Sequence, residues 1–314
     1  MTVSGASLVT PYTPLRTDEA EAFAELQADE PVKIQLGAQI DLFAAIACDT
    51  IFPKPASGEQ QSEDADKTEA KTEVTEKSDE TKAASGDASS DGPITGRQAD
   101  LALATHYANE LLLRLMMPPG LLAQGTDEEK AKAASVKPPT ASKITSLLEK
   151  VVQAYDCTLV ENTTSWLFER DDIEASKRLV ISSTEGSKSE GIAAIGDVWG
   201  VEMGVSLGSG KVKALGQRTT LHRRTTHTYQ LTRPTSRKIL SEVGKKFHHF
   251  PFSLRQLENE RDAKSGVVEC VRSNVFRGYE VIGDKDAAPV GRLLTTIGEL
   301  FIWLSWYFVC VTYN

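Results

Sequence analysis

Cysteine is scarce in this chain: the 314 residues include only four, Cys48, Cys157, Cys270 and Cys310, which lie far apart. Neither a CxxC pair nor a Cys/His ligand spacing occurs among them. The spacing therefore argues against a disulfide framework and against a zinc-binding module. A reducing compartment is the environment that this cysteine usage favours.

Other signals are missing as well. The chain does not open with a basic segment followed by an apolar run, so we expect no secretory signal. The apolar run at residues 301–311 has eleven residues, whereas a spanning helix needs roughly 20, so we expect no membrane association. The histidines form no HExxH pair, and no GxSxG motif is present. Residues 204–210 (GVSLGSG) lack the Gly-Lys-Ser/Thr of a phosphate loop, so nucleotide binding is not indicated.

The net charge of −9 averages two opposite blocks. Residues 55–95 contain eleven acidic residues and four lysines, a local charge of −7. This segment has almost nothing to bury, so we expect it to be disordered. Residues 211–246 contain ten Lys or Arg and a single acid, Glu242, a local charge of +9. Such a basic block favours a polyanionic partner.

Periodicity predicts the secondary structure of the rest. Alternation predicts strands at 31–36, 42–52, 178–182, 197–206, 217–223 and 290–297. Apolar stripes predict helices over 95–117, 140–155, 236–247 and 253–271. We interpret Thr95-x-x-Gln98 and Ser253-x-x-Gln256 as capping boxes, Thr140 as a cap, and residues 121–139 as a polar linker.

Four short segments are typical of one branch of a known family. They are GRQAD at 96–100, GQRTT at 216–220, PFSLR at 251–255 and GVVEC at 266–270. Together with residues 197–270, they resemble the proliferation-associated, curved-DNA-binding branch of the methionine-aminopeptidase-like family, which includes the ErbB-receptor-binding protein. The resemblance implies the pita-bread fold, an α/β fold with mixed antiparallel sheets covered by helices.

The aminopeptidases of this fold hold two metal ions with two aspartates, one histidine and two glutamates, and the ions activate a bridging water. The resemblance places these five positions at Gln35, Ile46, Trp166, Glu202 and Leu294. Because only Glu202 keeps a ligating side chain, the resemblance implies a pseudoenzyme with no metal and no cofactor. We expect Glu202 to pair with a nearby base and Trp166 to fill a pocket.

The resemblance further implies association with the large ribosomal subunit or its precursors, and binding of rRNA, structured RNA or curved DNA, in the nucleus (including the nucleolus) and cytoplasm. By charge, we expect the contacts from the following basic residues: Lys211, Lys213, Arg218, Arg223, Arg224, Arg237, Lys238, Lys245 and Lys246. Phosphate backbones bind through such side chains. No base-reading motif is visible, so recognition should follow shape or backbone.

Two other functions stay open. The protein could be a scaffold that binds other proteins through the vacated pocket, or an active metallo-aminopeptidase with ligands from elsewhere in the chain. Added salt should weaken polyanion binding strongly and leave an apolar pocket contact unchanged.

The sequence is shorter than the family pattern at both ends, so we expect a truncated pita-bread domain. Its N-terminal part would be residues 1–54, interrupted by the disordered acidic insert at 55–94 and resumed over 95–298. The final residues, 299–314, form an atypical apolar tail.

Overall fold

The computed structural model describes residues 2–4, 7–10, 31–52, 94–120, 125–184, 187–217 and 219–298. The expectations for the acidic insert, the apolar tail and Arg218 lie outside these residues. Within them, no helix has both the length and the apolar character that crossing a membrane requires.

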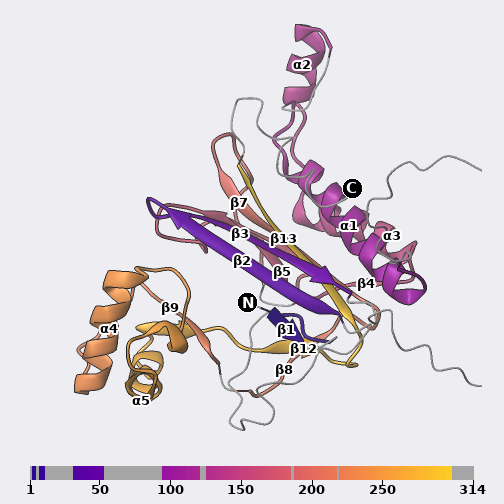
Figure 1. Ribbon diagram of the computed structural model, residues 1–314. Coiled ribbons are helices and arrows are strands. Elements are labelled where there is room, and N and C mark those ends of the chain that lie inside the picture. Colours follow the sequence, from indigo (N-terminus) through magenta and orange to yellow (C-terminus); the bar gives the residue numbers. More distant parts are fainter. Residues whose placement is uncertain are drawn as a thin grey trace, which may run out of the picture.

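The largest element is an antiparallel sheet (Figure 1). Its strands follow in the order β1 (Thr2–Ser4), β2 (Val32–Ile40), β3 (Phe43–Ile51), β13 (Val290–Gly298), β7 (Val198–Ser206), β5 (Thr163–Phe168) and β6 (Arg178–Ile181), with β4 (Thr158–Leu159) also paired to β7. The first and last thirds of the chain meet at its centre, where β13 lies between β3 and β7.

Helices α1 (Arg97–Met116) and α3 (Ala141–Gln153) cover one face of this sheet (Figure 1). Successive strand residues point to opposite faces. On β7, Trp199, Val201, Met203 and Val205 are therefore buried in the core that includes the helices. Their neighbours Gly200 and Glu202 face the other way, and this second face carries the site described below.

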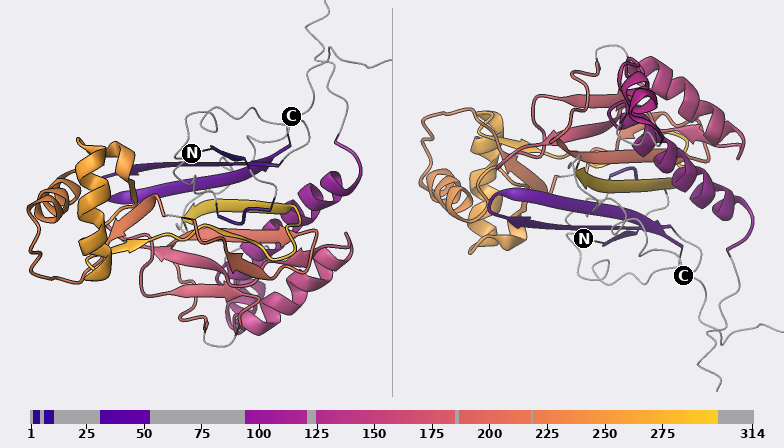
Figure 2. Two further views of the ribbon diagram at one scale, coloured as in Figure 1. Left: turned by 90° about the horizontal axis from the view of Figure 1, so that it is seen from below. Right: turned by 90° about the horizontal axis from the view of Figure 1, so that it is seen from above.

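A separate helical module, residues 219–278, lies beside the sheet (Figure 2). Its helices α4 (Pro234–Lys246) and α5 (Glu260–Arg272) pack on a small sheet ordered β10 (Phe252–Ser253), β9 (Leu221–Arg224), β11 (Phe276–Gly278). Phe252 and Phe276 are buried at its centre. The strands β8 (Val212–Ala214) and β12 (Ile282–Asp284) form a two-stranded sheet that leads back to β13.

Most predicted elements are confirmed, including the antiparallel α/β architecture and the Thr140 cap, whose side chain accepts a hydrogen bond from the backbone N of Lys143. The Thr95 capping box is wrong, because α1 begins after Gly96 and has no side-chain cap. The strand predicted at 217–223 is shorter and shifted, at Leu221–Arg224.

Two helix predictions also need correction. The linker predicted at 121–139 contains helix α2 (Asp127–Ala134), which a Thr126/Glu129 capping box starts. Its residues are almost all exposed, so no apolar stripe marked it in the sequence. The Ser253/Gln256 box exists but caps only a short 3-10 helix, η2 (Leu254–Gln256). Helix α5 starts independently, with Asn259 as its cap.

The contact between β3 and β13 uses side chains where the regular ladder is interrupted. The only residue pair in register is Leu294 with Cys48. On one side, the Thr50 hydroxyl accepts from the backbone N of Arg292 (2.8 Å) and donates to its carbonyl (3.0 Å). On the other, the Thr296 hydroxyl makes the same two bonds to Ile46, both 2.8 Å. The two threonines thus hold the strand that carries Arg292.

Candidate functional site

One row of paired residues crosses four strands at the centre of the large sheet. Gln35 on β2 pairs with Cys48 on β3, Cys48 with Leu294 on β13, and Leu294 with Glu202 on β7. Directly paired residues of antiparallel strands point to the same face. Positions that are 167 residues apart in the sequence, such as Gln35 and Glu202, therefore lie on one surface.

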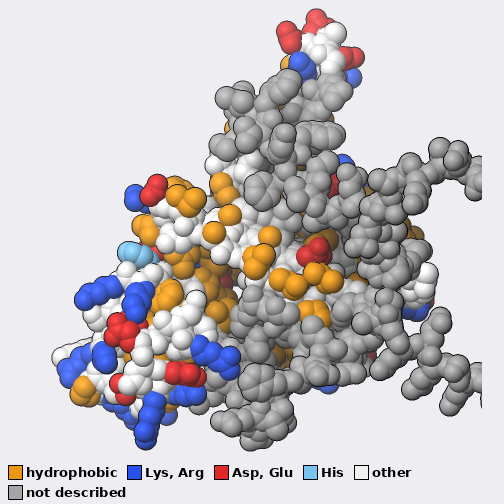
Figure 3. Space-filling view, viewed as in Figure 1, with side chains coloured by type: hydrophobic (Ala, Val, Ile, Leu, Met, Phe, Trp, Pro, Cys, Tyr) orange, Lys and Arg blue, Asp and Glu red, His pale blue; other side chains and the backbone are white. Residues whose placement is uncertain are grey.

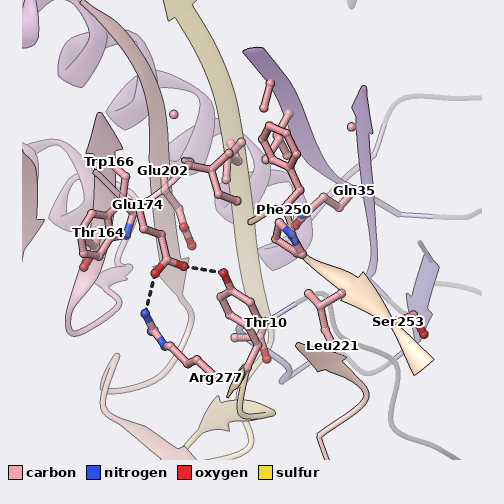
Figure 4. A pocket seen from close by; sticks show the side chains of 18 of the residues that line it. Thr10, Gln35, Thr164, Trp166, Glu174, Glu202, Leu221, Phe250, Ser253 and Arg277 are labelled. Carbon is pink, nitrogen blue, oxygen red and sulfur yellow. Dashed lines mark hydrogen bonds and ion pairs between the residues drawn. The ribbon is translucent and has the colours of Figure 1, made fainter. Parts of the chain in front are cut away.

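This surface is one wall of a cavity of about 1380 Å³. All five positions that the resemblance assigned to the metal ligands line it: Gln35, Ile46, Trp166, Glu202 and Leu294. The helical module supplies the facing wall, with Leu221, Phe250 and Ser253 (Figure 4). The structure thus brings the five positions together between the sheet and the module.

Arg292, which sequence reasoning missed, lies at the centre of the row. Its Nε donates to Glu202 Oε1 (2.7 Å), and its Nη1 donates to Gln35 Oε1 (3.1 Å) and contacts Cys48 Sγ (3.5 Å). Its side chain is only 5% exposed, against 21% for Glu202. Glu202 is therefore a half-buried carboxylate paired with a base, as expected. Strand alternation could have identified Arg292, because it precedes Leu294 by two residues and therefore points to the same face of the sheet.

The side chains at the five positions, together with Cys48, do not fit a pair of divalent metal ions. Ile46, Trp166 and Leu294 have no ligating atom, and Gln35 offers a neutral amide. Burial raises the pKa of the Cys48 thiol, with Arg292 opposing, so it stays protonated near neutral pH, whereas the thiolate is the form that binds metals. Across the described ranges, no three or more His, Cys, Asp or Glu side chains gather closely enough to hold an ion.

An acidic loop after β5 ties the sheet to the helical module. Asp172 accepts from Arg223 Nη1 (2.8 Å), and Glu174 accepts from the Tyr279 hydroxyl (2.7 Å) and pairs with Arg277 (Figure 4). Asp171 Oδ2 lies 2.8 Å from His249 Nδ1. Because these partners all belong to the module or to the strand that leaves it, the loop fixes the two walls of the cavity relative to each other.

Acidic side chains, most of them from outside the basic segment, neutralise part of it. Arg223 is 14% exposed and pairs with Asp172 and Glu174. Lys246 pairs with Glu242 (2.8 Å) and Glu258 (3.4 Å), and Lys238 lies 3.9 Å from Asp262. Lys211 and Lys213 belong to the β8 region, away from α4 (Figure 1). The predicted basic residues therefore do not form one continuous surface.

A smaller set does share one surface, which we call the α4 face: Arg224, Arg233, Arg237 and Lys245. Positions 233, 237, 241 and 245 recur every four residues, so they lie along one side of the helix. Arg224 reaches the same side, because a Cβ at Gly244 would be 3.1 Å from its Nη1. Arg233, Arg237 and Lys245 are exposed, and no ion pair to any of the four is found within the described part of the chain. Lys and Arg side chains are prominent on the helical module (Figure 3).

Glu269 of α5 holds the start of α4 in place. Its carboxylate accepts from the Thr232 hydroxyl (2.6 Å), the Thr232 backbone N (2.8 Å) and the Arg233 backbone N (3.1 Å). Arg233, the N-cap residue, provides no side-chain cap of its own. Glu269 therefore satisfies amides at a helix start, where a negative charge is favourable.

We expect this anchor to fail in acid. The Thr232 hydroxyl, followed by the Ser236 hydroxyl and the backbone amides of Thr232 and Arg233, lowers the pKa of Glu269 from 4.5 to about 2. A lowered folded-state pKa gives stability that is complete above 4.5 and lost as the pH falls towards 2. The protection of the amides at the start of α4, measured as the exchange rate relative to the intrinsic rate at each pH, should fall over that interval. In the Glu269→Gln variant this fall should be absent, and a fall equal to that of the wild type would contradict the assignment.

The sequence of this chain is similar to those of several known proteins. No protein-family model matches the sequence. The chain is 28% identical over 300 residues to the curved DNA-binding protein of Schizosaccharomyces pombe, covering 94% of this chain and 64% of that protein. It is 32% identical over 210 residues to ErbB-3 binding protein 1 of Solanum tuberosum, covering 66% of this chain and 49% of the relative. The chain thus spans about half to two thirds of the length of these curated relatives.

A solved structure described as a thermophilic Arx1 is more similar. It is 59% identical in sequence and superposes with a TM-score of 0.81. The match covers 96% of this chain and 72% of that chain.

Proposed function

Because this chain belongs to the proliferation-associated, curved-DNA-binding branch of the methionine-aminopeptidase-like family and has its pita-bread fold, we propose that it is a non-catalytic member that binds ribosomes or pre-ribosomal particles. The α4 face carries the proposal, because its cations have no acidic partner in the described structure. Binding would be to structured RNA or curved DNA through the phosphate backbone, in the nucleus and cytoplasm.

The proposal that the protein is not a peptidase rests on the sheet row. Water activation by this fold's enzymes needs two closely spaced metal ions. The five positions retain one carboxylate, and that carboxylate is already bound to Arg292 at 2.7 Å.

We expect the protein to release no methionine from a Met-Ala-Ser peptide, even with Co²⁺ or Mn²⁺ added. The measurement is chromatographic detection of free methionine, with a methionine aminopeptidase assayed in parallel as the positive control. Metal-dependent release that disappears in the Glu202→Gln variant would establish a peptidase and overturn this part of the proposal.

The α4 face has the chemistry of a phosphate-binding surface. Arg233, Arg237 and Lys245 are exposed along one helix, and Arg224 lies beside them, so several phosphates of one backbone can be reached together. Lys and Arg that neutralise phosphates release counterions, which makes the binding strongly dependent on salt. Of the other basic residues, Arg223, Lys238 and Lys246 would shape this surface through their ion pairs, whereas Lys211 and Lys213 would add contacts elsewhere. Arg218 stays a predicted contact by its charge alone.

The cavity supports a second candidate, a scaffold that binds a segment of another protein. Apolar side chains from both walls face it, among them Ile46, Trp166, Leu221, Phe250 and Leu294. Such a contact would persist at salt concentrations that release a polyanion. Complexes that survive high salt and are lost on Phe250→Ala substitution would favour this function over the first.

A further inference from the structure

We propose that the guanidinium of Arg292 is a built-in cation at the place where enzymes of this fold hold divalent metals. The site would then be closed to metal by occupation as well as by loss of ligands. The inference starts from position: three of the aligned ligand positions, Gln35, Glu202 and Leu294, stand in the same strand row. Arg292 lies two residues before Leu294 on β13, and its side chain reaches into this row.

The contacts of the guanidinium are those of a cation with a ligand set. It binds two of the aligned positions directly, Glu202 through Nε (2.7 Å) and Gln35 through Nη1 (3.1 Å). Its third contact, Cys48 Sγ at 3.5 Å, belongs to the residue between them in the row. The carboxylate, amide and sulfur atoms that face the site thus converge on one positive group.

Arg292 is also fixed so that it cannot easily leave. The Thr50 hydroxyl holds both its backbone N and its carbonyl, and its side chain is 5% exposed. A guanidinium stays protonated at all physiological pH values, so the positive charge is permanent. A divalent ion entering the row would meet this charge and would find Glu202 already engaged.

Two changes could have removed metal binding: the loss of ligands and the occupation of the site by Arg292. If ligand loss alone matters, then returning a carboxylate at position 35 should raise metal affinity by the same amount whether or not Arg292 is present. If Arg292 occupies the place, the carboxylate should bind the guanidinium instead, and affinity should return only when the arginine is also removed. Gln35→Asp, Arg292→Met and the double variant distinguish these cases.

We would titrate the wild type and the three variants with Co²⁺ alone, following its visible absorption and the heat of binding. The double variant is expected to bind Co²⁺ at least tenfold more tightly than Gln35→Asp, through the carboxylates at positions 35 and 202. Equal binding by Gln35→Asp and the double variant would overturn the proposal. So would a double variant that is folded by circular dichroism and binds no Co²⁺.

Because the double variant could fail to fold, Gln35→Asp alone provides a second test. Its melting temperature should rise above that of the wild type, since Arg292 gains a second charged partner, and millimolar Co²⁺ should leave it unchanged. A melting temperature raised by Co²⁺ would show that the place is open to a metal and would overturn the proposal. This result is independent of ribosome binding, so a protein that fails here and still co-sediments with ribosomes keeps the proposed function.

Discussion

Reversing the charge of the α4 face is expected to abolish co-sedimentation of this protein with the large ribosomal subunit. The variant carries Arg224→Glu, Arg233→Glu, Arg237→Glu and Lys245→Glu. Each substitution removes a cation that no acidic side chain in the described structure neutralises and puts a negative charge beside the phosphates. Four lost contacts should lower the slope of log affinity against log salt by about 3 to 4, and affinity at low salt by at least about tenfold.

The measurement is gradient sedimentation of extracts at several salt concentrations, with purified subunits to obtain the slope. A matched control reverses four exposed lysines of α2 and α3: Lys130, Lys132, Lys143 and Lys150. This control changes the net charge by the same amount on helices outside the helical module. Equal losses in both variants would show that total charge, and not the α4 face, governs binding. Retained binding in the α4-face variant would refute the proposed surface.

Breaking the Arg292–Glu202 pair is expected to cause the largest loss of stability among the substitutions considered. Arg292→Met leaves a carboxylate facing the cavity without its cation, and such disruptions of buried pairs cost about 3 to 5 kcal/mol. Glu202 retains 21% exposure, so solvent should reduce the cost to about 2 to 3 kcal/mol. Urea unfolding measures this change.

A double-mutant cycle separates the pair from the packing of the arginine stem. Adding Glu202→Gln to Arg292→Met removes the unpaired charge, and most of the lost stability should return. Arg272→Met, at the exposed end of α5, should change stability by less than about 0.5 kcal/mol. If Arg292→Met is as mild as this control, the guanidinium does not stabilise the contact between β13 and β7.

The strands and helices with a regular apolar pattern could be predicted from sequence because their periodicity records which face is buried. The alternation of residues 197–206 predicted β7, and the stripe of residues 140–155 predicted α3. Helix α2 was not predicted, because it buries no residue and depends on a capping box and helix-forming side chains. The boundary between η2 and α5 was also not predicted, because a capping box marks the start of a helix but not its length.

The candidate site was predictable only in part. The resemblance gave five positions, and the structure places all five around one cavity. It could not give Arg292, because an arginine two residues before Leu294 has no meaning until β13 is placed between β3 and β7. Nor could composition show that Arg223 is neutralised by Asp172 and Glu174, which lie some fifty residues earlier.

The amino-acid sequence by itself determined the alternation of the strands, the stripes of the main helices and the family, and through the family resemblance it predicted which positions have lost a metal ligand. These properties are local, or are carried by short motifs at fixed positions. The tertiary structure alone decided which cations remain unpaired on α4 and which cation occupies the centre of the sheet. Charges cancel according to distance in space, and the contacts that cancel them here join segments separated by tens to hundreds of residues.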